Sequence, residues 1–293
     1  MTHFAHIINP VDAYLGSDFY KSQQITFASM IAAKNFSNKD NIQLCVTQFE
    51  ADKTIIPTAF TQLSKLTQSI FDINKDLRGK KLPLIAEILS KLKEVPQADY
   101  CIYTNADIAL MPHFYETISE HILQGFDAIV INRRRISKRH LNQSSLNQMY
   151  SDLGRSHPGF DCFIFSKDLL NQFVLGNICI GVPFLEVTLM HNLISFANKP
   201  LFIADAHLTF HLGMDVMPSR NKAYYWQNRN EFFKQIYPKL KPHFKLDKFP
   251  YAALPWPQRA LKWILNPSLF TANYFHLESE HFFNEMRWRF LQR

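Results

Sequence analysis

Glycine is scarce in this sequence, with 8 residues among 293. Loops that bind phosphate through backbone N–H groups need several closely spaced glycines, because side chains would block the approach of the ligand. Neither the P-loop spacing nor the dinucleotide-binding spacing of glycines is present. The sequence therefore excludes a glycine-rich phosphate loop of either type.

Long apolar runs are also missing. The longest, at residues 126–131 and 196–206, end well short of the roughly 20 apolar residues that a membrane-spanning helix needs. The first ten residues lack a basic segment followed by an apolar core, so we expect no secretory signal. The four cysteines lack the close spacing of zinc or redox motifs, which predicts buried, reduced thiols in a cytoplasmic protein.

Strand-like and helix-like segments alternate along the chain. We expect strands at residues 4–10, 42–49, 100–104, 126–132, 160–165, 201–204 and 207–211, and helices at 22–34, 83–92, 112–123, 167–175 and 183–196. This order predicts an α/β fold with a mostly parallel central sheet flanked by helices, in which ligands bind at the carboxyl ends of strands. We expect one catalytic domain at residues 1–213 and an aromatic, basic, helical C-terminal extension packed on it at 214–293.

Asn105 and Asp107 follow the strand predicted at residues 100–104, with the small Ala106 between them. A carboxylate and an amide at one strand end suit a hard cation such as Mg²⁺ or Mn²⁺, which takes oxygen ligands and keeps places for water and phosphate oxygens. Asn and Asp are also ordinary turn residues, so a plain turn is the alternative.

Residues 103–108, Tyr-Thr-Asn-Ala-Asp-Ile, resemble the strand and Asp-x-Asp turn of the GT-A glycosyltransferases, also called nucleotide-diphospho-sugar transferases. The neutral Asn105 departs from that pattern. Residues 157–163, 181–186 and 209–213 are similar to further segments of the family and come in the family's order. The resemblance covers residues 4–213 and implies a GT-A fold that binds a nucleotide sugar through a divalent metal.

Specific roles come with this resemblance. It implies that Asp107, Asn105 and His211 hold Mg²⁺ or Mn²⁺ on the donor diphosphate. It also implies that Asp161 binds an acceptor hydroxyl, that Gly159 allows close backbone approach, and that Glu186 at a helix start deprotonates the acceptor. Inversion at the anomeric carbon follows if Glu186 is the base, and a retaining mechanism stays open otherwise.

Four further residues are candidate donor contacts. Asn9 and Asp12 lie at the end of the first predicted strand, where the family holds the base and ribose. Arg78 and Lys81 precede a predicted helix, and the free N–H groups of a helix start favour phosphate. A solvated basic loop is the alternative for the second pair.

The sequence thus predicts a metal-dependent glycosyltransferase that moves a sugar from a nucleotide-diphospho-sugar donor to a saccharide or other hydroxyl acceptor. A non-catalytic α/β protein that binds a polyanion through an exposed basic loop at residues 133–139 is an alternative. No nucleic-acid-binding motif accompanies that loop, so nucleic acid is disfavoured as a partner. A nucleotidyltransferase is a third reading, although residues 9–16 lack the cations of that class.

The C-terminal extension mixes aromatic and basic residues, as a segment lying on a membrane surface would. The residues concerned are Trp256, Arg259, Lys262, Trp263, Arg287, Trp288 and Arg289. Core-packing aromatics with exposed cations are the alternative. A peripheral position at the inner membrane face is compatible with a cytoplasmic enzyme.

Overall fold

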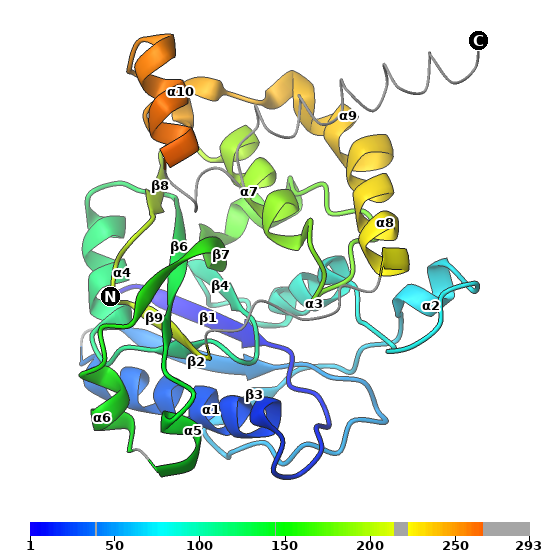
Figure 1. Ribbon diagram of the computed structural model, residues 1–293, viewed down its shortest axis with the longest axis vertical. Helices are drawn as coiled ribbons and strands as arrows, with labels where there is room; N and C mark the ends of the chain where they lie inside the picture. The colour runs from blue at the N-terminus through cyan, green and yellow to red at the C-terminus, as the bar shows by residue number, and fades with distance from the viewer. Residues whose placement is uncertain (39, 144, 214–221, 266–293) are drawn as a thin grey trace.

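The computed structural model describes residues 1–38, 40–143, 145–213 and 222–265 (Figure 1). Its centre is a mixed sheet in the order β3-β2-β1-β4-β7-β6-β9-β5, with β8 also paired to β6. The strands are β1 His3–Ile8, β2 Asn41–Val46, β3 Phe60–Gln62, β4 Tyr100–Thr104, β5 Ala109–Leu110, β6 Ala128–Ile136, β7 Arg155–Ser166, β8 Pro200–Ile203 and β9 Thr209–Leu212.

Helices cover both faces of this sheet (Figure 1). They are α1 Asp18–Phe36, α2 Ile70–Ile73, α3 Ile85–Ser90, α4 Phe114–Leu123, α5 His140–Gln143, α6 Leu146–Tyr150, α7 Leu185–Phe196, α8 Lys222–Glu231, α9 Tyr237–Leu240 and α10 Trp256–Leu265. Short 3₁₀ segments at Lys91–Glu94, Lys167–Asn171, Lys241–His243 and Leu246–Lys248, and a π-helical turn at Phe232–Ile236, complete the described elements.

The run of apolar residues in β1 reflects burial on both faces of the sheet. Ala5 and Ile7 point into a core that also contains residues of α3 and α7, whereas Phe4 and Ile8 point into a second core with residues of α1 and α4. A strand covered on both faces gains from apolar residues at every position, so simple alternation is lost. The predicted α/β fold, with a mostly parallel sheet flanked by helices, is confirmed.

Strand β7 is the main antiparallel member, since it pairs antiparallel to both β4 and β6. In the described part of the connection from β6 to β7 the only elements are the short helices α5 and α6, and the chain returns directly beside β6. The start of the strand predicted at residues 160–165 is wrong, because β7 already begins at Arg155.

The predicted basic loop at residues 133–139 is also wrong for its first half. Strand β6 continues to Ile136, because Arg134 and Arg135 pair with both β7 and β9. Pairing on both sides gives hydrogen-bond partners to the backbone N–H and C=O groups of these arginines. The strand can therefore continue beyond its apolar segment.

The described part of the C-terminal segment, residues 222–265, is helical and packs on α7. Phe232, Ile236, Leu240, Phe249 and Trp263 are buried in the same core as the sheet. The boundary predicted at residue 213 and the division into two domains remain predictions. Arg287, Trp288 and Arg289 lie outside the described residues. None of the described helices combines the length and apolar character needed to cross a bilayer.

All four cysteines are buried free thiols, as predicted. Burial raises the pKa of Cys45, Cys101 and Cys179 to about 12, so these thiols stay protonated. Buried thiols that stay protonated are poor nucleophiles.

Candidate functional site

The site lies at the carboxyl ends of β1 and β4. These parallel strands are in register, with Ile7 opposite Tyr103, so the residues that follow each strand emerge side by side. Asn9 is buried and donates its side-chain N–H to the carbonyl of Thr47, at the end of β2, over 2.7 Å. This bond ties the ends of β1 and β2 together, next to the turn that contains Asp107.

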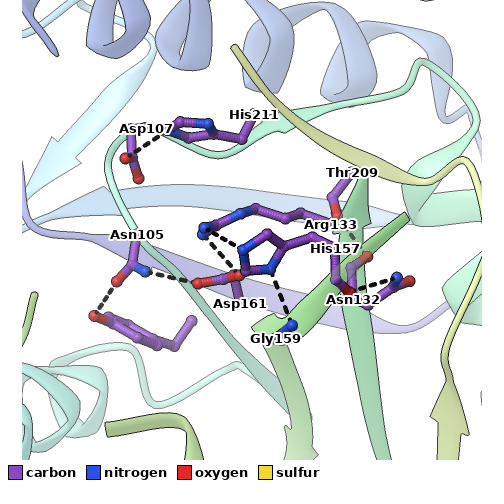
Figure 2. Close-up of polar contacts among 10 residues, drawn as sticks. Asn105, Asp107, Asn132, Arg133, His157, Gly159, Asp161, Thr209 and His211 are labelled. Carbon is purple, nitrogen blue, oxygen red and sulfur yellow. Dashed lines mark hydrogen bonds and ion pairs between the residues drawn. The ribbon is translucent and has the colours of Figure 1, made fainter. Parts of the chain in front are cut away.

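Asn105 links β4 to β7. Its Oδ1 accepts a hydrogen bond of 2.9 Å from the hydroxyl of Tyr103, and its Nδ2 donates to Oδ1 of Asp161 over 3.2 Å (Figure 2). The Oδ1 of Asn105, a predicted metal ligand, is therefore already engaged by a hydroxyl within the protein.

Asp107 and His211 meet across the site. Oδ2 of Asp107 lies 3.1 Å from Nε2 of His211, and both side chains are about four-fifths buried (Figure 2). Burial alone would raise the pKa of Asp107, but the hydrogen bond and charge of His211, together with the charge of Arg133, bring it below its usual value. Asp107 is therefore an anion at neutral pH.

Arg133 places a cation inside the same cluster. Its Nη1 lies 2.8 Å from Oδ2 of Asp161, and only 18% and 12% of the two side chains are exposed. The pairing of β6 with β7 shifts register on both sides of Asn132, which is the irregularity of a β-bulge and changes the direction in which the next side chains point. Burial raises the pKa of Asp161, because it outweighs the attraction of Arg133.

His157, Gly159 and Glu186 extend the cluster toward α7. Nε2 of His157 lies 3.3 Å from Nη2 of Arg133, and the N–H of Gly159 donates to Nδ1 of His157 over 2.9 Å. A Cβ atom at Gly159 would stand only 2.7 Å from Oε2 of Glu186, so the carboxylate lies directly against the strand backbone. Burial, with the charges of Arg133 and Arg135, lowers the pKa of His157 to about 3 and keeps the ring neutral.

The fold therefore brings five of the predicted residues into one polar cluster, in which Glu186 is placed through its approach to Gly159. The five are Asn105, Asp107, Asp161, Glu186 and His211. Sequence reasoning missed two members of the cluster. Arg133 was assigned to an exposed basic loop, and residue 157 was included only as the start of the segment 157–163, without a role of its own. The register shift that turns Arg133 toward Asp161 has no signal in the sequence.

The predicted donor residue Asp12 lies in the loop after β1 and lines a surface cavity of about 420 Å³. The other walls come from the same loop, from the first turn of α1 and from the loop after β2, and include Tyr14, Tyr20, Lys53 and Ile55. Both loops leave the carboxyl edge of the sheet, where Asn105 also lies. The cavity is therefore on the side of the sheet that carries the polar cluster.

Arg78 and Lys81 are engaged in their own surroundings. The guanidinium of Arg78 donates to the carbonyls of Lys75 and Leu77, over 2.6 and 2.9 Å. The ammonium of Lys81 lies 4.3 Å from the ring centre of Phe49, a cation–π contact. The structure joins neither cation to the Asp107 cluster through a direct contact.

The donor set of Asp107 and His211 fits the divalent metal that the resemblance implies. Adjacent ligands of an octahedral ion at about 2.1 Å stand about 3.0 Å apart, close to the 3.1 Å between Oδ2 of Asp107 and Nε2 of His211. Among the described residues no group of three His, Cys, Asp or Glu side chains is placed to hold a metal. Two protein ligands suit an ion whose other positions go to water and diphosphate oxygens.

Comparisons with known proteins find similarity in structure alone. No family model matches the sequence, and no curated protein does. The TarS fragment 1–349 of S. aureus, solved with UDP-GlcNAc, is 11% identical over 96% of this chain and 92% of its own, with a TM-score of 0.47.

Glucosyl-3-phosphoglycerate synthase of M. tuberculosis is 11% identical over 79% of this chain and 78% of its own, with a TM-score of 0.44. A structure of the same enzyme with Mg²⁺ and UDP is 11% identical over 73% of each chain, with a TM-score of 0.40.

Proposed function

We propose that this protein is a glycosyltransferase that moves a sugar from a nucleotide-diphospho-sugar donor to a hydroxyl acceptor with the help of a divalent cation. The observation that carries the proposal is the contact between Asp107 and His211 at the carboxyl edge of the parallel strands. It provides a charged oxygen and a ring nitrogen at the spacing of adjacent metal ligands.

The donor would lie along the carboxyl edge of the sheet. Its base and ribose fit the cavity of about 420 Å³ beside Asp12, which is within the usual size of small-molecule sites. Tyr14 is largely exposed there and offers a ring face for stacking, while Lys53 offers a cation. The diphosphate would then extend toward Asp107.

Asp107 and His211 would hold Mg²⁺ or Mn²⁺, and the bound cation would neutralise the negative charge that develops on the leaving diphosphate. Arg133 adds a fixed positive charge to the same cluster. Asn105 would keep Asp161 in place through its hydrogen bond. One similar structure was solved with Mg²⁺ and UDP, so uridine donors are the first to test.

The acceptor would enter on the side of Glu186. This carboxylate stands at the first turn of α7 against Gly159, and no side chain at Gly159 keeps it away from the strand. Glu186 is our candidate for the base that removes the proton from the acceptor hydroxyl, and Asp161 would orient the acceptor. With Glu186 as base the reaction inverts the anomeric carbon, and with a structural Glu186 a retaining route applies.

The alternative functions find less support in the fold. Arg133 and Arg134 form ion pairs with Asp161 and Asp205, so these cations are partly neutralised within the protein. A polyanion surface at residues 133–139 would then depend on the remaining cations of the run. No observation of the site favours a nucleotidyltransferase.

The test is a transfer assay in Mn²⁺ with UDP, GDP and dTDP sugars, in which released nucleotide is measured and the anomeric configuration of the product is followed by NMR. We expect release from one donor, loss of release in EDTA, and at least about hundredfold slower turnover in Glu186→Gln. The matched control is Glu120→Gln, an exposed glutamate of α4. Full activity in Glu186→Gln would show that Glu186 is not the base. If none of the donors releases its nucleotide, the proposed function is contradicted.

A further inference from the structure

The net charge of the chain is concentrated in one segment. Residues 222–265 contain nine Lys and Arg residues and two acidic residues, which equals the formal charge of +7 of the whole chain. The rest of the chain, residues 1–221 and 266–293, has equal numbers of cations and acids. The excess positive charge of the chain therefore falls within residues 222–265.

Most of these cations are exposed to solvent. The exposed ones are Lys222, Lys234, Lys239, Lys241, Lys245 and Lys262. Residues 237–265 run along one end of the long axis of the molecule, past α7 and β8, at the top of the view in Figure 1. Five of the six cations in this stretch are lysines, and Asp247 is its one acid.

Helix α10 adds an apolar surface to this end of the molecule. Leu261, Ile264 and Leu265 recur at helical spacing on one side and are 56%, 61% and 69% exposed. The other side carries Trp263, which is buried against the ring of Phe249 and donates its indole N–H to the carbonyl of Pro250 over 2.7 Å. A helix of a globular protein normally buries its apolar stripe, whereas α10 is anchored by one tryptophan and turns its aliphatic stripe outward.

We propose that residues 237–265 form a membrane-docking surface for anionic lipid. The aliphatic stripe of α10 would enter the boundary between headgroups and acyl chains, and the exposed lysines of residues 239–245 and 262 would face the lipid phosphates. Helices that lie at a membrane surface combine an aliphatic stripe with lysines in this way. Each lysine near an anionic membrane adds electrostatic attraction, and salt weakens that attraction. A soluble polyanion matches the charge but leaves the aliphatic stripe exposed, so the combination favours a lipid surface.

The test is flotation of the full chain with vesicles of phosphatidylglycerol and phosphatidylcholine, compared with vesicles of phosphatidylcholine alone. We expect binding to the anionic vesicles that falls as NaCl is raised. The double variant Lys239→Glu/Lys245→Glu should lower the partition coefficient at least about tenfold. Lys75→Glu/Lys93→Glu changes the net charge equally at exposed positions elsewhere and should have a much smaller effect.

The aliphatic stripe is tested separately with Leu261→Ser/Ile264→Ser/Leu265→Ser. The control is Leu123→Ser on α4, which removes an even more exposed leucine far from α10 in sequence. Thermal unfolding checks that each variant folds, and Ile264→Ser alone replaces the triple variant if the latter does not. Loss of flotation in the stripe variant supports the proposal.

Three outcomes would overturn the proposal that residues 237–265 dock on a membrane. Flotation could be absent, it could fall equally in both charge doubles, or the stripe variant could float unchanged. A stripe variant that converts a dimer to a monomer in sedimentation, with lipid binding intact, would assign the stripe to a second copy of the chain. Nucleotide binding by these variants is measured in parallel, so that failure of membrane docking and failure of the proposed donor site can be told apart.

Discussion

Nε2 of His211 lies 3.1 Å from Oδ2 of Asp107, although 104 residues separate them in the chain. The turn after β4 supplies the carboxylate, and β9 supplies the imidazole through its pairing with the end of β6. Two elements on opposite sides of β7 and β6 thus meet over the carboxyl edge of the sheet. This contact is the geometric basis of the proposed metal site.

Gly159→Ala should disturb the proposed base without changing the donor site. The new Cβ would stand 2.7 Å from Oε2 of Glu186, too close for any carbon–oxygen contact, so the carboxylate must move. Because displacement of a reacting group by about 1 Å costs up to about a hundredfold in rate, we expect turnover to fall between tenfold and a hundredfold. Donor affinity, measured by calorimetry, should stay within about twofold.

A shorter acid at residue 186 serves as the control for this change. Gly159→Ala/Glu186→Asp gives the carboxylate more room and should regain part of the lost turnover relative to Glu186→Asp alone. If Gly159→Ala has normal turnover, Glu186 is not placed by its contact with the strand.

Arg133 and Asp161 should behave as a buried ion pair in a double-mutant cycle. Removing the cation alone in Arg133→Met leaves a buried carboxylate and should lower the free energy of unfolding by about 3 kcal/mol. Arg133→Met/Asp161→Asn removes both charges and should recover most of that loss. Urea unfolding of the four proteins measures the coupling, and additive losses would contradict the assignment of a buried pair.

Stability should fall steadily as the pH drops below about 6.5. Burial lowers the pKa of His6 to about 3 and that of His191 to about 4, from the usual 6.5. Between these values the unfolded chain takes up a proton at each histidine that the folded protein does not, so protonation favours unfolding. Each ring therefore removes up to about 1.4 kcal/mol of unfolding free energy per pH unit in that window, and stability is full above it.

The variant His6→Gln tests this prediction. Glutamine does not titrate and can still hydrogen-bond toward Tyr115 and Thr104, the partners of the histidine ring. Urea unfolding from pH 4.5 to 7.5 should show a shallower pH slope for His6→Gln than for wild type and for the exposed-site control His113→Gln. Equal slopes in all three proteins would contradict the prediction.

The strands and helices were the predictable part of this fold. Strand β4 and helix α7 lie where apolar content and spacing placed them, because β-branched residues and helical periodicity report local preference directly. The end of β6 was mispredicted, since arginines there look like loop residues. Pairing with two neighbouring strands keeps them in the sheet, and that pairing is tertiary information.

The candidate site also has residues that the sequence could identify and contacts that it could not. The Asp107 turn could be identified because it follows an apolar strand, and His211 because it ends a later one. The pairing of Arg133 with Asp161 depends on a register shift between β6 and β7, and the contact of Glu186 with Gly159 depends on how α7 packs. Neither is set by local sequence.

The most direct test of the proposed site is calorimetric titration with UDP and UDP sugars in Mn²⁺ and in EDTA, on wild type, Asp107→Asn and the exposed-site control Asp168→Asn. The amide of Asp107→Asn keeps the shape but loses the charge that attracts the cation. We predict nucleotide binding that needs Mn²⁺, that weakens at least about tenfold in Asp107→Asn, and that is unchanged in Asp168→Asn. Equal binding with Mn²⁺ and with EDTA, or in wild type and Asp107→Asn, would contradict a metal-assisted donor site at Asp107.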